Sequence, residues 1–149
     1  MKFSCSVLID LPREKVITLF NNPNNMSHWQ DGFVRLENIN GTHGDVGSKN
    51  KITYDQKGKE MILIETLKVY NLPYEISGSY EHKMMDNEMQ NLFTEVSPTQ
   101  TRWVANIHYT RMKSFLKVIA FINPSMFKKQ VQKWMDQFKA FAETGISIA

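Results

Sequence analysis

The feature that most constrains the fold of this chain is an aromatic stripe near its C-terminal end, between residues 125 and 143. Its large apolar residues recur at steps of four, three, four and three. At about 100° per residue they fall within roughly 80° of one another on a helix. We expect Ser125 to cap this helix and Gly145 to end it. So wide a stripe needs a broad apolar partner, such as one face of a β-sheet. Its members are Phe127, Val131, Trp134, Phe138 and Phe141.

Length and composition limit what the rest of the chain can be. With 149 residues, 42% hydrophobic and 22% charged, the chain suits one globular domain, and we assign residues 1–149 to it. No signal-peptide pattern is present, and no apolar run reaches the ~18 residues of a membrane-spanning helix. The single cysteine, Cys5, excludes an internal disulfide. Together these features favour a cytoplasmic protein.

The net charge of +3 is unevenly distributed. Residues 1–110 carry 11 Lys and Arg against 13 Asp and Glu, whereas residues 111–149 carry 7 against 2. This basic C-terminal third predicts at most weak contact with an anionic membrane surface, through Arg111, Lys113 and Lys117 around the apolar run 115–122. The alternative is a solvated outer helix face. We expect no nucleic-acid partner.

Upstream of the stripe, the sequence predicts a long antiparallel sheet interrupted once by two short helices. Alternating apolar and polar residues predict a first strand over residues 2–10, and Pro12 and Pro23 each open a short helix after it. A doubly wound parallel sheet is disfavoured, because no crossover strand separates these helices. Turn residues then delimit six more strands, near residues 33–39, 48–54, 60–70, 74–81, 88–96 and 101–110.

Alternation within the strands predicts which side chains face the terminal helix. Residues 61–64 are apolar on both faces, so Glu65 cannot be assigned to either face. The strand over residues 88–96 is ambiguous for the same reason. Three sets of residues are predicted to face inward: Asn50, Ile52 and Tyr54; Ile76, Gly78 and Tyr80; Trp103, Ala105, Ile107 and Tyr109.

Motifs for metal, nucleotide or nucleophilic chemistry are missing from the sequence. None of the four histidines stands at a metal-ligand spacing, and no GxSxG is present. The glycine-rich stretch 41–47 runs into a strand and lacks the Walker Lys-Ser/Thr pair. We therefore expect no metal and no cofactor.

What remains is an unusually aromatic set of inward positions. Tyrosines and an asparagine among apolar residues are the usual composition of a small-molecule pocket, although the same residues could simply fill a core. The candidate ligand-binding residues are Trp29, Asn50, Tyr54, Tyr80, Trp103, Tyr109, Phe127, Trp134 and Phe138.

The order of these elements resembles the SRPBCC superfamily, which includes START lipid-transfer domains, birch-pollen-allergen-like proteins and polyketide cyclase/dehydrase-like proteins. The matching pieces are Val-Leu-Ile-Asp-Leu-Pro at 7–12, Trp29, Gly-Asp-Val-Gly-Ser at 44–48, Asn-Leu-Pro at 71–73 and the terminal helix. The resemblance implies an α+β helix-grip fold: a curved antiparallel sheet of about seven strands around a long C-terminal helix, with a cavity between. It also implies binding of a lipid, sterol, polyketide or other hydrophobic molecule.

Two functional hypotheses follow. The first is a non-enzymatic binder or carrier of a hydrophobic small molecule. The second is an enzyme of the polyketide cyclase, aromatase or dehydratase type, for which Glu65, Glu95 and Tyr80 are the candidate polar groups. A carboxylate inside the cavity would favour the enzyme, whereas a cavity with only apolar groups and tyrosines would favour the binder.

Overall fold

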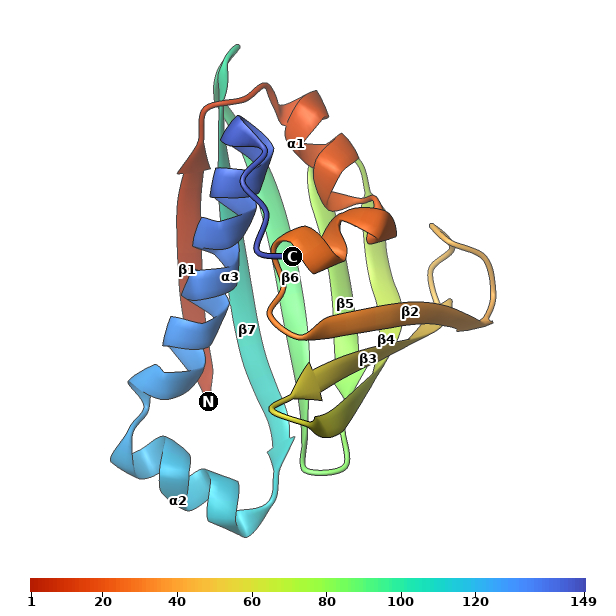
Figure 1. The fold of residues 1–149 in the computed structure, drawn as a ribbon, viewed down its shortest axis with the longest axis vertical. Helices are drawn as coiled ribbons and strands as arrows, with labels where there is room; N and C mark the ends of the chain where they lie inside the picture. Colours follow the sequence, from red (N-terminus) through yellow and green to blue (C-terminus); the bar gives the residue numbers. More distant parts are fainter.

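The computed structural model describes residues 1–149 and has the α+β helix-grip architecture that the sequence predicts. Seven antiparallel strands form one sheet in the order β1-β7-β6-β5-β4-β3-β2. Two short helices follow the first strand, and a long helix ends the fold (Figure 1). The strands are β1 (Lys2–Ile9), β2 (Phe33–Asn40), β3 (Lys49–Gln56), β4 (Lys59–Asn71), β5 (Glu75–Glu81), β6 (Met85–Ser97) and β7 (Gln100–Met112). The helices are α1 (Arg13–Phe20), the 3-10 helix η1 (Pro23–His28), α2 (Ser114–Ile122) and α3 (Ser125–Thr144).

The terminal helix α3 ends where the sequence predicts but begins differently. Gly145 adopts a left-handed conformation with φ of 75°, and its amide donates to the Phe141 carbonyl at 2.8 Å. The predicted cap at Ser125 is wrong. Pro124 already has helical dihedrals, so Ser125 lies in the first turn, and its hydroxyl donates to the Asn123 side chain at 3.0 Å instead.

A solid aromatic core fills the space under the C-terminal half of α3. Phe138 has no exposed surface and packs against Phe20 of α1, Trp29 after η1, and Trp103 of β7, with ring centroids 5.3 to 5.9 Å away. Such edge-to-face arrangements are favourable beyond the area they bury. Phe93 of β6 completes the cluster against Trp103. The two short helices and the turn after them therefore supply an essential part of this core.

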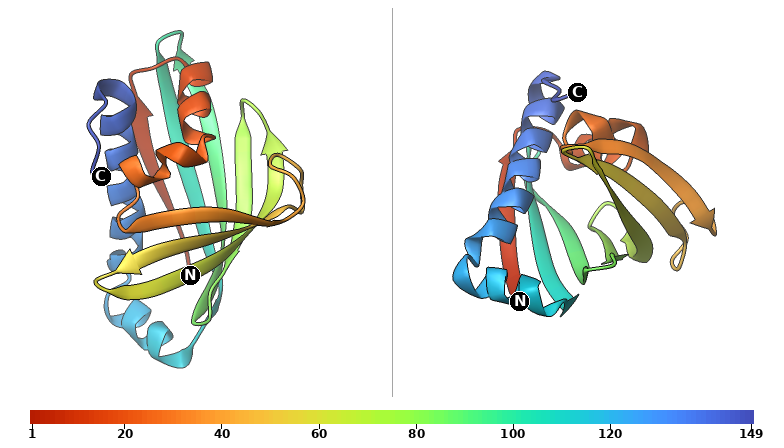
Figure 2. Two further views of the ribbon diagram at one scale, coloured as in Figure 1. Left: turned by 45° about the vertical axis from the view of Figure 1, so that its right-hand side comes forward. Right: turned by 60° about the horizontal axis from the view of Figure 1, so that its bottom comes forward.

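The sheet curls as it runs from β1 to β2. In Figure 1, β2 and β3 run nearly crosswise to β7 and α3, and Figure 2 shows the same curl from two further sides. Irregularities in the pairing assist the bend, with register shifts in β2–β3 near Phe33 and in β4–β5 near Leu67. The curl separates β4 and β5 from the terminal helix.

Helix α2 was not predicted from the sequence. It occupies nine residues between β7 and α3, and none of them is buried. It lies at the end of the molecule below β7 and the start of α3 (Figure 1). None of the helices combines the length and the hydropathy that a membrane-spanning segment requires.

Candidate functional site

A cavity of about 750 Å³ lies between α3, the η1 region and the inner face of the curled sheet. This volume falls within the range of small-molecule sites. Of its 39 lining residues 21 are hydrophobic, so its wall is mainly apolar with polar groups at particular places. Exposed members of the lining include residues 55–57 at the β3–β4 hairpin, His43 in the β2–β3 loop and Gln130 on α3. The cavity therefore reaches the surface at these elements.

The structure brings eight of the nine candidate ligand-binding residues together around this cavity. The ninth, Phe138, lies in the closed core and does not line it. Its place is explained by Phe20 and Trp29, which fill the space in front of it. The eight lining residues are Trp29, Asn50, Tyr54, Tyr80, Trp103, Tyr109, Phe127 and Trp134.

One wall of the cavity is made by Tyr54 stacked on Trp134, with ring centroids 5.6 Å apart. The Tyr54 hydroxyl donates to Gln30 Oε1 at 2.7 Å, and the Trp134 indole N–H donates to Asp31 Oδ2 at 3.0 Å. Burial, with a smaller contribution from Glu65, raises the pKa of Tyr54, so the phenol stays neutral. The polar handles of both rings are satisfied, which leaves their faces as the contact surface.

Glu65 lies on the inner face of β4 and lines the cavity. The Asn50 amide donates to Glu65 Oε1 at 3.0 Å, and Asn38 donates in turn to Asn50 Oδ1 at 3.2 Å. Tyr80 lies opposite Glu65 in the β4–β5 register. Burial raises the pKa of Tyr80 well above its ordinary value, and the charge of the adjoining Glu65 carboxylate and its interaction with the phenol raise it further. A carboxylate and a neutral phenol therefore adjoin each other on the cavity wall.

Glycine at position 78 suits the close approach of strand β4. Its missing Cβ would lie 3.0 Å from the Thr66 carbonyl oxygen and 3.7 Å from the Tyr80 hydroxyl. The Tyr80 hydroxyl lies at an ordinary contact distance from this Cβ position, so the tyrosine ring extends along the strand over residue 78. The strand alternation predicted that Gly78 and Tyr80 share the inner face, and both line the cavity.

Glu95, the other acidic candidate, lies away from the cavity. Its side chain is half exposed, 3.9 Å from the Arg13 guanidinium. It does not belong to the lining, so we no longer consider it a candidate catalytic group. The difference between the two acids comes from position. The lining residues of β6 all lie between positions 85 and 91, whereas Glu95 pairs with Thr101 near the β6–β7 turn.

Polar residues that the sequence did not single out complete the site. The buried Asn91 side chain accepts from the Trp103 indole N–H at 2.9 Å. Tyr109, which the sequence did predict, packs edge-on to Phe127 with centroids 5.1 Å apart, and burial raises its pKa. Gln30 was missed because it follows a helix whose end is not marked by any alternating pattern. Asn91 was missed because it breaks the apolar alternation of its strand.

Cys5 and the histidines contribute little to this site. Cys5 is buried, outside the lining, with its thiol 3.6 Å from the Lys128 carbonyl oxygen, and burial raises its pKa. Of the histidines only His43, in the β2–β3 loop, borders the cavity. No three His, Cys, Asp or Glu side chains are grouped so that they could hold a metal ion.

Comparison with solved structures identifies the same fold in proteins of very different sequence. The Zhui aromatase/cyclase from Streptomyces sp. R1128 superposes with a TM-score of 0.78 at 8% identity, covering 99% of this chain and 96% of that one. Protein TTHA0849 from Thermus thermophilus superposes with a TM-score of 0.74 at 13% identity, covering 99% of this chain and 100% of that one. Ara h 8.0201 superposes with a TM-score of 0.70 at 10% identity, covering 95% of this chain and 97% of that one.

These similarities confirm the helix-grip fold that the sequence predicts. No protein-family model matches the chain, and no curated protein matches it. At such low identity the shared architecture carries no residue-level assignment. The chemistry of the cavity therefore rests on this chain's own side chains.

Proposed function

We propose that this protein binds a small, mainly hydrophobic molecule in the cavity between α3 and the curled sheet. The observation that carries the proposal is the cavity itself: about 750 Å³ of space bounded by apolar and aromatic side chains inside a folded protein. Burying apolar surface of a guest contributes about 25 cal/mol per Å². A lipid-, sterol- or polyketide-sized guest could then reach micromolar affinity without an ion pair.

The polar groups on the cavity wall specify what else the guest carries. Glu65 accepts a hydrogen bond from Asn50 on one carboxylate oxygen and adjoins the neutral Tyr80 phenol. An ionised carboxylate offers about four lone-pair sites, so these two neighbours leave it able to accept from a guest as well. The guest that fits best is therefore an apolar molecule with one hydroxyl or phenol group that donates to Glu65.

Displacement of a fluorescent dye tests this proposal. An environment-sensitive apolar dye should brighten on binding and be displaced by fatty acids, sterols or polycyclic phenols. Met89→Trp, on the inner face of β6, should fill the cavity and abolish the signal. Val96→Trp is the matched control, because Val96 is an exposed residue of the same strand outside the lining. Equal dye binding by both variants would contradict the proposal.

A second comparison isolates the contribution of Glu65. Glu65→Gln should lower the binding affinity of hydroxylated guests by about tenfold relative to that of their deoxy analogues. The reason is that a hydrogen bond to a charged group contributes about 1.5–3 kcal/mol. Binding of the purely apolar dye should not change. A uniform loss across all guests would mean that Glu65 supports the fold of β4 and does not select the ligand.

The second candidate function is an enzyme of the polyketide cyclase, aromatase or dehydratase type. What favours it is the presence of a carboxylate inside the cavity, beside the Tyr80 phenol. Glu65 would take the α-proton of a bound ketone, and Tyr80 would donate a hydrogen bond to the enolate oxygen that forms. Incubation with poly-β-ketone analogues tests this second function. Wild type should convert them, whereas Glu65→Gln should bind them without converting them. If wild type converts none, the enzyme proposal is wrong and only the binding proposal remains.

A further inference from the structure

Helix α2 presents an apolar surface to solvent. Phe115, Val118, Ile119 and Ile122 follow the i, i+3, i+4, i+7 spacing of a single helix face, and all four are exposed. Phe121 beside them is 88% exposed. The more protected residues, Leu116 and Ala120, lie on the opposite side. An amphipathic helix normally turns its apolar stripe inward, so an outward stripe marks a surface that binds something.

The surroundings of this stripe are basic. No Asp or Glu occurs between residues 113 and 135. Lys113, Lys117, Lys128 and Lys129 are exposed, and none of them takes part in an ion pair. An apolar stripe flanked by free ammonium groups complements a surface with an apolar interior and anionic headgroups.

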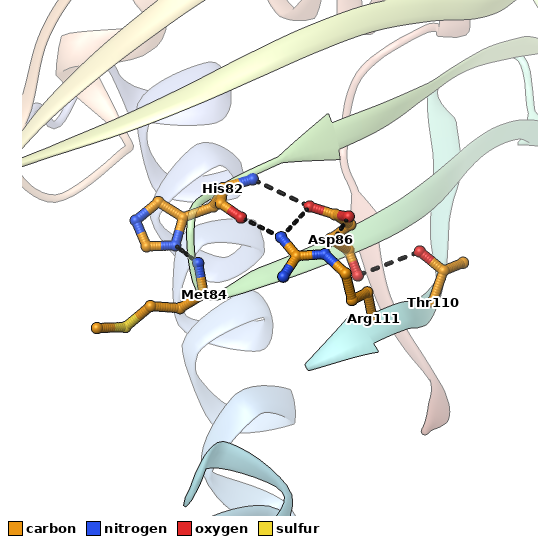
Figure 3. Close-up of polar contacts among 5 residues, drawn as sticks. All are labelled: His82, Met84, Asp86, Thr110 and Arg111. Carbon is orange, nitrogen blue, oxygen red and sulfur yellow. Dashed lines mark hydrogen bonds and ion pairs between the residues drawn. The ribbon is translucent and has the colours of Figure 1, made fainter. Parts of the chain in front are cut away.

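The base of α2 is fixed to the sheet by a polar cluster (Figure 3). Arg111 at the end of β7 donates to both carboxylate oxygens of Asp86, from Nε at 2.7 Å and from Nη2 at 2.9 Å, and also to the His82 carbonyl. The Lys113 amide donates to the Met84 carbonyl at 2.9 Å. Arg111 is thus occupied and not available to a partner, but it holds the start of α2 against the β5–β6 hairpin.

From these observations we propose that α2 docks this protein on an anionic lipid bilayer, with the stripe embedded at the interface and the four lysines at the headgroups. The helix has nine residues and cannot span a bilayer, so it lies in the plane of the interface. A second copy of the chain is a poorer occupant, because symmetric pairing of two stripes would bring the two sets of lysines together.

Docking there would bring the cavity close to the bilayer. Phe127 and Gln130, in the first turns of α3 directly after α2, both line the cavity, and Gln130 is exposed. The stripe and one opening of the cavity therefore lie at the same end of the molecule. If the proposed binding function is correct, its guest exchanges with the membrane. The docking itself does not depend on that function.

Vesicle flotation tests the docking. Wild-type protein should float with phosphatidylcholine vesicles that contain phosphatidylglycerol, bind less as salt rises, and bind pure phosphatidylcholine vesicles much more weakly. The double variant Phe121→Ser/Ile122→Ser should lose more than about tenfold in affinity, because two large apolar side chains no longer insert. Its melting temperature should match wild type, since both residues are exposed.

Two controls make the result specific. Val46→Ser alters an exposed apolar residue of the β2–β3 loop and should float like wild type. Lys113→Glu/Lys117→Glu should reduce binding to anionic vesicles only. Wild type that fails to float at low salt, or a Phe121→Ser/Ile122→Ser variant that floats as well as wild type, would overturn the proposal. So would a concentration-dependent dimer that this variant dissociates, because α2 would then be an interface between copies.

Discussion

The two halves of α3 carry the same aromatic stripe but face different surroundings. Phe138, in the C-terminal half, lies in a closed core, whereas Phe127 and Val131, in the N-terminal half, line the cavity. The difference lies in what fills the space opposite. Phe20 and Trp29, from the segment inserted after β1, occupy the region in front of Phe138. No comparable insertion faces the N-terminal half, where the sheet has curled away.

This comparison teaches that a cavity forms in this fold where no inserted segment fills the space between the helix and the sheet. The helix stripe is continuous, and the strands alternate in the same way under both halves. The short helices, which Pro12 and Pro23 place at their starts, and the curl of the sheet distinguish the two regions. One half can then supply stability while the other is left free to take a guest.

The largest effect should come from opening the packed half. Phe138→Ala should lower the free energy of unfolding by about 3–5 kcal/mol, as expected when a fully buried aromatic is removed. Phe127→Ala, on the same stripe, should cost clearly less, because one side of Phe127 already borders the cavity. Urea denaturation measures both. Equal losses would show that the cavity half is as tightly packed as the core.

The next effect concerns Trp103, which borders both regions. Trp103→Phe removes the indole N–H and leaves the buried Asn91 carbonyl unpaired, at a cost of about 1–3 kcal/mol. The double variant Trp103→Phe/Asn91→Leu should recover part of this loss, because no buried polar group is then orphaned. Denaturation midpoints of the two single variants and the double variant measure these changes in stability. If the two single losses of stability simply add in the double variant, the hydrogen bond between Trp103 and Asn91 contributes nothing.

A smaller effect is expected on the cavity wall. Leu63→Ala on β4 should cost under about 1.5 kcal/mol, below the 2–5 kcal/mol typical of closed cores, since Leu63 borders space that is already empty. Ile9→Ala in the packed core is the control and should fall in the higher range. Calorimetry with and without a bound apolar dye sharpens the comparison: the dye should raise the melting temperature of Leu63→Ala less than that of wild type.

The sequence predicted the apolar residues better than the polar residues of the cavity wall. The stripe of α3 and the inward sets on β3 and β7 were identified because apolar residues recur there at a regular period, and the short helices were identified from Pro12 and Pro23. Glu65 and Asn91 face inward among apolar residues, which is the arrangement that alternation cannot distinguish from a surface position. Polar residues such as Glu65 and Asn91 give the cavity its chemistry, but they interrupt the apolar alternation from which buried positions are predicted.

Helix α2 was missed for a related reason. The run from Phe115 to Ile122 is apolar, and its stripe gives a helical period, but without a cap or an acidic first turn it has no start signal. The helix begins directly after β7, where Arg111 binds Asp86 and the Lys113 amide donates to the Met84 carbonyl of the β5–β6 hairpin. That contact joins residues far apart in the sequence, and so no local pattern records it.

The smallest effect should come from the ion pair that links the β5–β6 hairpin to β7. Arg111 lowers the pKa of Asp86, chiefly through the hydrogen bonds between the two side chains, and the neighbouring His82 amide lowers it further. A carboxyl whose pKa is lower in the folded state stabilises the fold above its unfolded pKa of about 3.9, and this contribution disappears as pH falls through the folded value. Asp86→Asn should therefore destabilise the protein slightly at pH 7 and pH 5, by less than any change above, because the pair lies at the surface. The difference from wild type should shrink as pH falls below about 4 and vanish only below the lowered pKa of Asp86 in the folded protein, and added salt should reduce it at every pH. Thermal unfolding of both proteins across this range measures it. A difference that persists in acid would mean that Asp86 acts through the shape of the hairpin and not through its charge.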